Sequence, residues 1–269
     1  MNTWTHLEIA DGTSSFRLGS WSQFFDFLQA EVFDIPGARQ QSYIWRGHRR
    51  SDWSLSTTLD RQLEGLGMLT RASDELEEVS AKHLQRFKYA ARGRRGATPA
   101  TLSENEWWAL GQHFGLATPL LDWTRAPFAA LYFAYEEASV EADIPRAIYG
   151  LNETAVLSKL SEIENGPSVE KGRMRSVEVI DPMSDENQRL VSQGGCFTRA
   201  PIGLPIERWV SEEFEGTNET ALLRIELPNT DRLNCLQALN RMNINHLSLF
   251  PDLSGASRST NLRLEIAHQ

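Results

Sequence analysis

Apolar residues recur at helical spacing in five stretches of the chain, and this spacing predicts five helices. The first stretch is the richest in aromatic side chains, with Trp21, Phe24, Phe25 and Leu28 on one wide face. In the second, acidic residues from Asp74 onward precede basic ones, an order that suits the helix dipole. The predicted helices cover residues 21–33, 72–91, 104–114, 126–137 and 230–242.

Short runs of β-branched or aromatic residues, bounded by turn-forming residues, predict strands. Residues 187–191 fit either a short strand or a helix, and the last ten residues fit either a strand or a tail. Residues 158–175 are polar and contain glycine, which suggests a surface excursion. The predicted strands cover residues 43–46, 120–123, 147–152, 177–180, 196–198 and 220–227.

The order of these elements, without an internal repeat or a Pro- or Ser-rich linker, predicts a single α+β domain. We expect mixed or antiparallel sheets flanked by helices. Within this one compact unit, residues 1–40 are expected to form an N-terminal helical segment and residues 41–269 the main domain. The length of 269 residues is ample for a sizeable core.

The composition is that of an ordinary globular protein, with 41% apolar and 23% charged residues. No run approaches the roughly 18 apolar residues that cross a bilayer, and the N-terminus lacks the basic start and apolar core of a signal peptide. The two cysteines, Cys196 and Cys235, form no disulfide framework, which favours a reducing compartment. We therefore expect a cytoplasmic protein that does not enter a membrane.

The net charge of −9 argues against wholesale coating of nucleic acid. Basic residues nevertheless gather in two places, at residues 46–50 and at residues 86–95. These clusters either hold an anionic ligand or are solvated helix faces. The chain has no P-loop, dinucleotide GxGxxG, nucleophile elbow or HExxH motif, and its six histidines show no metal spacing. No metal is expected.

Arg46 stands between Trp45 and Gly47 on a short apolar strand. Arginine presents a rigid fork of donors and keeps its charge when partly buried. A glycine lets a ligand or another backbone approach closely. This combination suits a bound phosphate or carboxylate, and the alternative is a buried structural ion pair, with Asp122 as the candidate partner.

Asp122, Trp123 and Thr124 end a buried strand a few residues before a helix begins. Free backbone N–H groups gather at helix starts, so these side chains either contact a ligand or cap the helix. Gln112 and His113 end another helix, where His113 either donates to a ligand or caps that helix.

Five ordered motifs resemble those of the FRG-domain family, which is named for an aromatic-Arg-Gly motif. They run from about residue 43 to residue 253, most of the chain. The chain departs from the family pattern at Trp45, where Phe is usual, and at Gly195, a second glycine after Gly194. The motifs are Trp45-Arg46-Gly47, residues 112–124, residues 129–134, residues 187–190 with Gln193-Gly194, and residues 249–253.

The chain also resembles ADP-ribosyltransferases, whose early strand ends in Arg-Gly and whose second strand ends in Ser or Thr before a helix. Arg46-Gly47 and Thr124 are similar to these two elements, and Glu186 is similar to the glutamate of a third, offset by about two positions. The resemblance implies NAD as substrate, with Arg46 on a phosphate. The implied catalytic residues are Arg46, Glu186, Arg189 and Gln193. The implied NAD-binding residues are Arg46, Gly47, Gln112, His113, Asp122, Trp123, Thr124 and Tyr132.

These resemblances imply an ADP-ribosyltransferase-like fold and an NAD-dependent ADP-ribosyltransferase, acting as an intracellular toxin or anti-phage effector. An antitoxin or regulatory partner is expected to restrain it. The acceptor is RNA, DNA or a protein, and the basic loop at residues 92–95 suits phosphates. The alternatives are a non-catalytic nucleotide-sensing or interaction module, an NAD hydrolase and a nuclease. The nuclease is disfavoured because no Asp/Glu cluster suits two metal ions.

Overall fold

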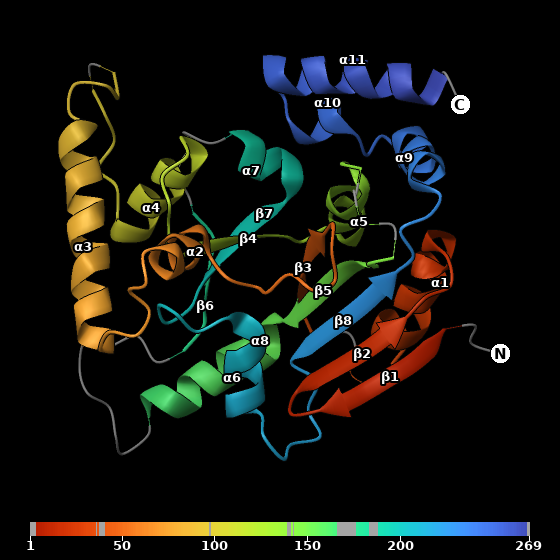
Figure 1. Cartoon of the computed structure of the whole chain (residues 1–269), viewed down its shortest axis with the longest axis horizontal. Helices are drawn as coiled ribbons and strands as arrows, with labels where there is room; N and C mark the ends of the chain where they lie inside the picture. Colours follow the sequence, from red (N-terminus) through yellow and green to blue (C-terminus); the bar gives the residue numbers. More distant parts are fainter. Residues whose placement is uncertain are drawn as a thin grey trace.

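The computed structural model describes residues 4–35, 37, 41–96, 98–138, 141, 143–165, 176–182 and 188–267. They form an eight-stranded sheet in the order β1-β2-β8-β5-β3-β4-β7-β6, flanked by helices (Figure 1). This confirms the predicted α+β class. The strands are β1 (Thr5–Ala10), β2 (Thr13–Arg17), β3 (Tyr43–His48), β4 (Leu120–Thr124), β5 (Arg146–Asn152), β6 (Glu178–Ile180), β7 (Gly195–Arg199) and β8 (Leu222–Leu227).

The sheet is mixed, because β2 and β8 pair in parallel while the other neighbours are antiparallel. The pairing is uneven along the sheet. Strand β3 pairs with β5 over its whole length, but it shares a single residue pair with β4, Trp45 with Thr124. We call this junction the seam. The two strands diverge there, so backbone groups beyond that pair need other partners.

Residues 21–33, predicted as a helix, are helical throughout but in three forms: a 3-10 turn (Trp21–Gln23), α1 (Phe24–Leu28) and a π-helix (Gln29–Phe33). Ser20 caps this segment, and Gln23 returns a bond to the Ser20 backbone. The other helices are α2 (Thr58–Gly65), α3 (Ser73–Ala90), α4 (Glu104–His113), α5 (Pro127–Tyr135), α6 (Glu153–Glu164), α7 (Gln188–Gln193), α8 (Ile206–Glu213), α9 (Arg232–Arg241), α10 (His246–Leu249) and α11 (Leu253–Ala267).

The six predicted strands and five predicted helices are confirmed, with ends shifted by a few residues, and residues 188–191 lie in helix α7. Other expectations were wrong. The segment expected to be helical at residues 1–40 also contains strands β1 and β2. The expected C-terminal strand or tail is helix α11. Helix α6 covers residues 158–164 of the expected surface excursion, and residues 166–175 of it lie outside the described residues. Every residue of β1 is exposed, so no apolar alternation marks it as a strand.

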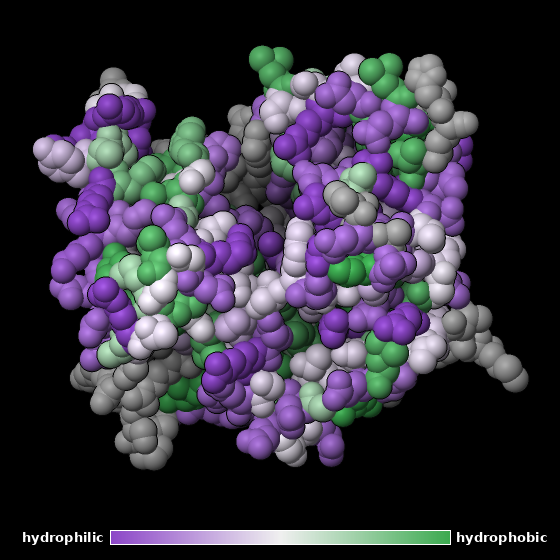
Figure 2. All heavy atoms as spheres, in the orientation of Figure 1, coloured by the Kyte–Doolittle hydropathy of each residue, from purple (hydrophilic) through white to green (hydrophobic). Residues whose placement is uncertain are grey.

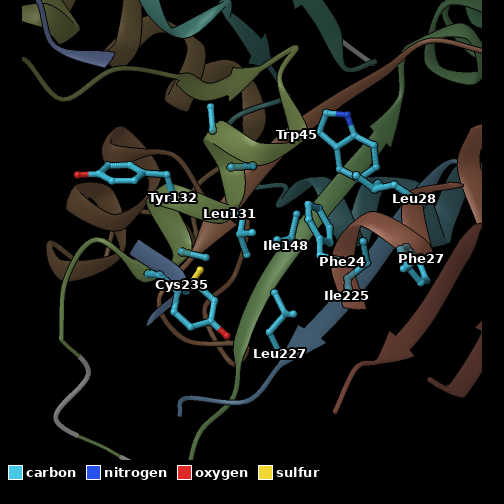
Figure 3. Close-up of a cluster of buried hydrophobic side chains, with 14 of the residues drawn as sticks. Phe24, Phe27, Leu28, Trp45, Leu131, Tyr132, Ile148, Ile225, Leu227 and Cys235 are labelled. Atoms are coloured by element: carbon cyan, nitrogen blue, oxygen red, sulfur yellow. The ribbon is translucent and has the colours of Figure 1, made fainter. Parts of the chain in front are cut away.

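The core lies on both faces of the sheet because side chains alternate along each strand. On one face, Trp45, Ile148 and Ile225 from three neighbouring strands meet Phe24 of α1 and Leu131 of α5 (Figure 3). On the other face, a second buried cluster joins alternate residues of the same strands to helices α6 and α8. Its members include Ile44, Tyr149, Leu222, Val156 and Trp209.

Helix α5 is apolar on nearly all sides, and six of its residues are buried. It packs against strands β3, β4 and β5 and against helix α9. Pro127 opens the helix at a position where a backbone donor is not needed. A helix enclosed in this way is a rigid support for Phe133 and Glu136, which lie near its C-terminal end and line the cavity described below.

The molecular surface in Figure 2 is mainly hydrophilic, with small apolar patches and a hollow near the centre of the view. Among the described residues, no helix combines the length and the apolar character required to cross a membrane.

Candidate functional site

Arg46 spans the seam where β3 and β4 diverge. Its Nη1 donates to the backbone carbonyl of Asp122, with 2.6 Å between the atoms. Its Nε donates to Nε2 of His48 at 2.9 Å. The Asp122 carboxylate is more distant, with Oδ2 3.9 Å from Nη1. The guanidinium therefore replaces a missing strand–strand bond, and the ion pair with Asp122 considered from the sequence is present only as a long contact.

The bond from Arg46 fixes the proton on His48. An arginine only donates, so Nε2 of His48 accepts and the imidazole is neutral with its proton on Nδ1. Burial, followed by the charge of Arg46, lowers the pKa of His48 to about 3. His48 consequently holds the guanidinium in place without adding charge or supplying an anionic partner.

The charge of Arg46 is only partly balanced. Its side chain is 22% exposed, and burial lowers its pKa while the Asp122 carboxylate opposes that shift. Arginine stays protonated even so. A cation that is largely out of water, with a carboxylate only at 3.9 Å, gains from an anion bound beside it.

Gly47 is required because the backbone of helix α5 lies directly against β3 at this position. A Cβ at this position would lie 2.6 Å from the backbone nitrogen of Ala134 and closer still to the carbonyl oxygen of Ala130, both on α5. Glycine thus lets β3 lie directly on the helix. Of the two explanations considered for this residue, the close approach of another backbone is the one seen.

Asp122 and Gln112 are linked at the mouth of the site. Gln112 Nε2 donates to Asp122 Oδ1 at 2.7 Å, and Oε1 of the same side chain accepts from the hydroxyl of Thr118. The Asp122 side chain is 64% exposed. The amide therefore orients a carboxylate that still has an oxygen available to a ligand.

Thr124 ties together the ends of three elements. Its hydroxyl donates to the carbonyl of Gln193 at 2.5 Å and accepts from the backbone nitrogen of Ala126 at 3.1 Å, just before α5. Gln193 Nε2 in turn donates to the carbonyl of Leu249 at 3.1 Å. Gly194, with φ +55°, lets the chain turn sharply from α7 into β7. These contacts fix the turn after α7 against the seam.

A cavity of about 880 Å³ opens beside the seam. Its wall combines aromatic rings with charged groups of both signs. Trp53 and Arg49 contribute from the loop after β3, where the guanidinium carbon lies 5.1 Å from the centre of the ring. Phe133, Glu136 and Phe250 contribute from α5, its end and the segment after α10. Cations, aromatic rings and hydrogen-bonding groups in one concave site suit an anionic ligand that carries ring systems.

The cavity brings together most of the residues predicted from the sequence. Its wall includes Arg46, Gly47, Gln112, His113, Asp122, Trp123, Thr124 and Gln193. The indole of Trp123 is buried, and its Nε1 donates to Thr198 at 2.8 Å. Trp123 therefore packs in the second buried cluster.

Of the remaining three predicted residues, one lies in the core and two have no described side chain. Tyr132 is buried in the core cluster of α5, and Figure 3 shows its ring directed away from the other labelled side chains. Arg189 falls within helix α7, where the structure describes the backbone. Glu186 lies outside the described residues.

The sequence reasoning missed Glu136, a carboxyl group in the cavity wall. Burial, followed by the charge of Glu137, raises its pKa to about 7. The signal was present but unremarkable: a pair of glutamates directly after an apolar helix. Among the described residues, no group of three or more His, Cys, Asp or Glu side chains is placed to hold a metal ion.

Comparison with known families gives a match over residues 41–143, from the approach to β3 to just beyond α5, and the matching family is the FRG domain. Residues 41–143 of this chain are therefore similar to an FRG domain. No curated protein and no solved structure matches the chain. The FRG match contains Arg46, Gly47, Asp122 and Glu136, so one side of the cavity belongs to it. The wall contributed by Gln193 and Phe250 comes from later in the chain.

Proposed function

We propose that this FRG-domain protein is an NAD-dependent ADP-ribosyltransferase whose cavity beside the seam binds NAD as substrate. The observation that carries the proposal is Arg46, a largely buried guanidinium on the cavity wall with a carboxylate only at 3.9 Å. A phosphate of NAD would supply the missing negative charge through charge-assisted hydrogen bonds.

The wall fits the rest of such a molecule. The cavity volume of about 880 Å³ lies within the range of ligand pockets, roughly 300–1,000 Å³. Trp53, Phe133 and Phe250 offer ring faces for adenine or nicotinamide. Asp122 offers a carboxylate oxygen for a ribose hydroxyl, since Gln112 occupies Oδ1.

Each residue then has a role in holding the substrate. Bound NAD supplies a glycosidic bond to a good leaving group, nicotinamide. Arg46 would bind a phosphate, and His48 keeps its guanidinium oriented through the 2.9 Å bond. Thr124 holds the turn at Gln193 in place, so that this part of the wall is preorganised.

We propose a nucleic acid as the acceptor. Two cations flank the ring of Trp107 on α4, with Lys88 Nζ 5.9 Å and Arg95 Cζ 4.7 Å from its centre. Nearby, the guanidinium of Arg92 stacks on the exposed ring of Tyr89 at 3.6 Å. Cations interleaved with aromatic rings are typical of surfaces that bind single-stranded nucleic acids.

The test incubates the purified protein with NAD labelled in its adenylate phosphate, alone and with RNA, DNA or cell lysate. Label transferred to RNA or DNA supports both parts of the proposal. Label on a lysate protein instead shows that the acceptor is a protein, not a nucleic acid. Nicotinamide release without transfer makes the protein a hydrolase. Cleavage of the RNA or DNA without NAD consumption indicates a nuclease.

Arg46→Lys gives the matched loss-of-function variant. Lysine keeps the charge but not the fork that reaches His48 and Asp122 together, so we expect label transfer to fall at least about tenfold with a small change in melting temperature. Arg208→Lys on the exposed face of α8 is the control and should leave label transfer and melting temperature unchanged. A large loss of melting temperature with unchanged transfer would make Arg46 a structural residue only.

A second candidate function is a non-catalytic nucleotide-binding module. Of the proposed catalytic residues other than Arg46, Gln193 is the one whose side chain is described, and its amide is engaged by the Leu249 carbonyl. This candidate predicts that calorimetry detects NAD binding while the labelling experiment shows no NAD consumption.

We also propose that the enzyme acts in the cytoplasm as a toxin or anti-phage effector, restrained by an antitoxin or regulatory partner. The support is the sequence resemblance to such transferases. Induced expression in a host cell should arrest growth with the unaltered chain and spare it with Arg46→Lys. Equal growth with both chains contradicts a toxic role that depends on this site.

A further inference from the structure

A second wall of the cavity is built around Glu136, the residue that follows helix α5. Its side chain is 19% exposed, and its Oε2 atom is fully buried without a hydrogen-bond partner among the described residues. A buried carboxyl oxygen without a partner costs free energy. Its presence in the cavity wall therefore requires an explanation.

His246 on α10 faces this oxygen. Its side chain is 7% exposed, and its Nε2 atom lies 3.7 Å from Oε2 of Glu136, beyond hydrogen-bond distance. Nε2 is also buried without a partner among the described residues. Two buried polar atoms thus face each other across a gap that neither fills.

The imidazole is fixed from its other side. Nδ1 of His246 is hydrogen-bonded to the hydroxyl of Tyr132, and the ring stacks on Phe250 with 4.8 Å between centres. Burial raises the pKa of Tyr132, so the phenol keeps its proton. A phenol that donates to Nδ1 leaves the imidazole proton on Nε2, directed toward Glu136.

The pair is not a structural ion pair. Burial lowers the pKa of His246 to about 4, so the imidazole is neutral near pH 7. A charged pair would close to hydrogen-bond distance to offset its desolvation. The open gap instead suits a carboxyl group that changes its protonation state while its neighbour stays neutral.

We propose that Glu136 is the proton acceptor for the reaction in this cavity and that His246, held by Tyr132, positions it. The proposal rests on the transferase function proposed above. In the step concerned, the bond from ribose C1′ to nicotinamide breaks and nicotinamide leaves with the electron pair. A bond forms from C1′ to an oxygen or nitrogen of the acceptor, whose proton passes to the Glu136 carboxylate.

The surroundings suit this role. Burial dominates and favours the neutral carboxyl, and Glu137 adds to it, while Arg258, Arg49 and Arg232 favour the carboxylate. His246 faces Glu136 directly, and Tyr132 is linked to it through His246. The resulting pKa of about 7 leaves a large fraction of carboxylate at neutral pH, which is the condition for efficient general-base catalysis.

The test compares Glu136→Gln with Glu215→Gln, an exposed glutamate in the loop after α8. We expect Glu136→Gln to lower NAD turnover about 100-fold, with the affinity for ADP-ribose changed less than threefold. Turnover by the unaltered protein should rise with pH to a plateau, with a midpoint near 7, and Glu215→Gln should show the same profile. His246→Gln should move that midpoint, because it alters the neighbour of the carboxyl group.

A second measurement does not depend on turnover. Carbon-13 NMR of glutamate-labelled protein follows the Glu136 carboxyl, assigned by its loss in Glu136→Gln, with and without ADP-ribose. A midpoint near 7 that shifts when ADP-ribose binds supports the assignment. An ordinary glutamate midpoint, or one that ADP-ribose leaves unchanged, overturns it.

The two proposals can fail separately. If the unaltered protein consumes NAD and Glu136→Gln consumes it equally well, the role of Glu136 is wrong and the transferase function stands. If the unaltered protein consumes no NAD, the transferase function and the proton-transfer step are both wrong. The NMR titration then shows whether Glu136 still belongs to the ligand site.

Discussion

The two walls of the cavity are built in opposite ways. At the first wall, Arg46 is held by hydrogen bonds to the Asp122 carbonyl and to His48. At the second wall, neither the Oε2 atom of Glu136 nor Nε2 of His246 has a hydrogen-bond partner among the described residues. The first wall keeps its charge permanently, whereas the second carries a group that gains and loses a proton near neutral pH.

The difference indicates a division of labour. A bonded guanidinium is rigid and always charged, which suits recognition of an anion. A buried carboxyl group has a shifted pKa, which suits proton transfer. Helix α5 connects the two walls: strand β3 lies against its backbone at Gly47, and Glu136 follows its last turn.

Gly47→Ala should disrupt the packing of β3 on α5, which connects the two walls, and should cause the largest loss in the free energy of unfolding. The added Cβ would meet the backbone of α5, which does not move as a side-chain end does. Overpacking of this kind costs about 3 kcal/mol or more. Chemical denaturation should show that loss in the free energy of unfolding, or no soluble folded protein.

Gly65→Ala is the matched control, because nothing lies within 4 Å of a Cβ built there at the end of α2. Its stability should match or slightly exceed that of the unaltered chain. If both variants were equally stable, β3 would not depend on its close approach to α5.

Glu136→Gln should sharpen the comparison through its pH dependence. The pKa of Glu136 is raised from 4.5 to about 7, so between these values the folded protein holds a proton that the unfolded chain releases. The free energy of unfolding therefore falls as the pH rises through this window. Glutamine removes that loss, so the variant should be more stable than the unaltered protein by about 3 kcal/mol at pH 8 and equal to it near pH 4.

Denaturant titrations at the two pH values measure the difference. Asp122→Asn at the first wall is the comparison, since that side chain is 64% exposed. A gain for Glu136→Gln that is independent of pH would show that its carboxyl group is not the one that titrates.

The regular elements of the fold were predictable where apolar residues repeat with one period. Strand β5 is buried at every position and helix α5 is almost wholly apolar, so both stand out in the sequence. Strand β1 and helix α11 are mostly exposed and carry no such pattern. They form because a neighbour, β2 or α10, offers an edge or a surface, and tertiary contacts of this kind leave little local signal.

The site was predictable where its polar residues lie within apolar stretches of the sequence. An arginine between Trp45 and Gly47, or Asp122 after two leucines, is conspicuous because a polar group in an apolar strand needs a partner. Glu136 is not conspicuous, since a glutamate after a helix is ordinarily solvated. In the folded protein His246, which is 110 residues later in the chain, lies beside this carboxyl group.

Gln112→Leu should have the smallest effect and tests whether the first wall depends on its bonds. Leucine removes the donor to Asp122 Oδ1 and the acceptor of the Thr118 hydroxyl, and Thr118 is fully buried. We expect the free energy of unfolding to fall by about 1 kcal/mol and the affinity for NAD to fall about threefold, because Asp122 loses its orientation. Gln62→Leu, on the exposed side of α2, is the control for adding an apolar side chain. Calorimetry and denaturation that show no difference between the two variants would mean that Arg46 and its backbone contact alone maintain this wall.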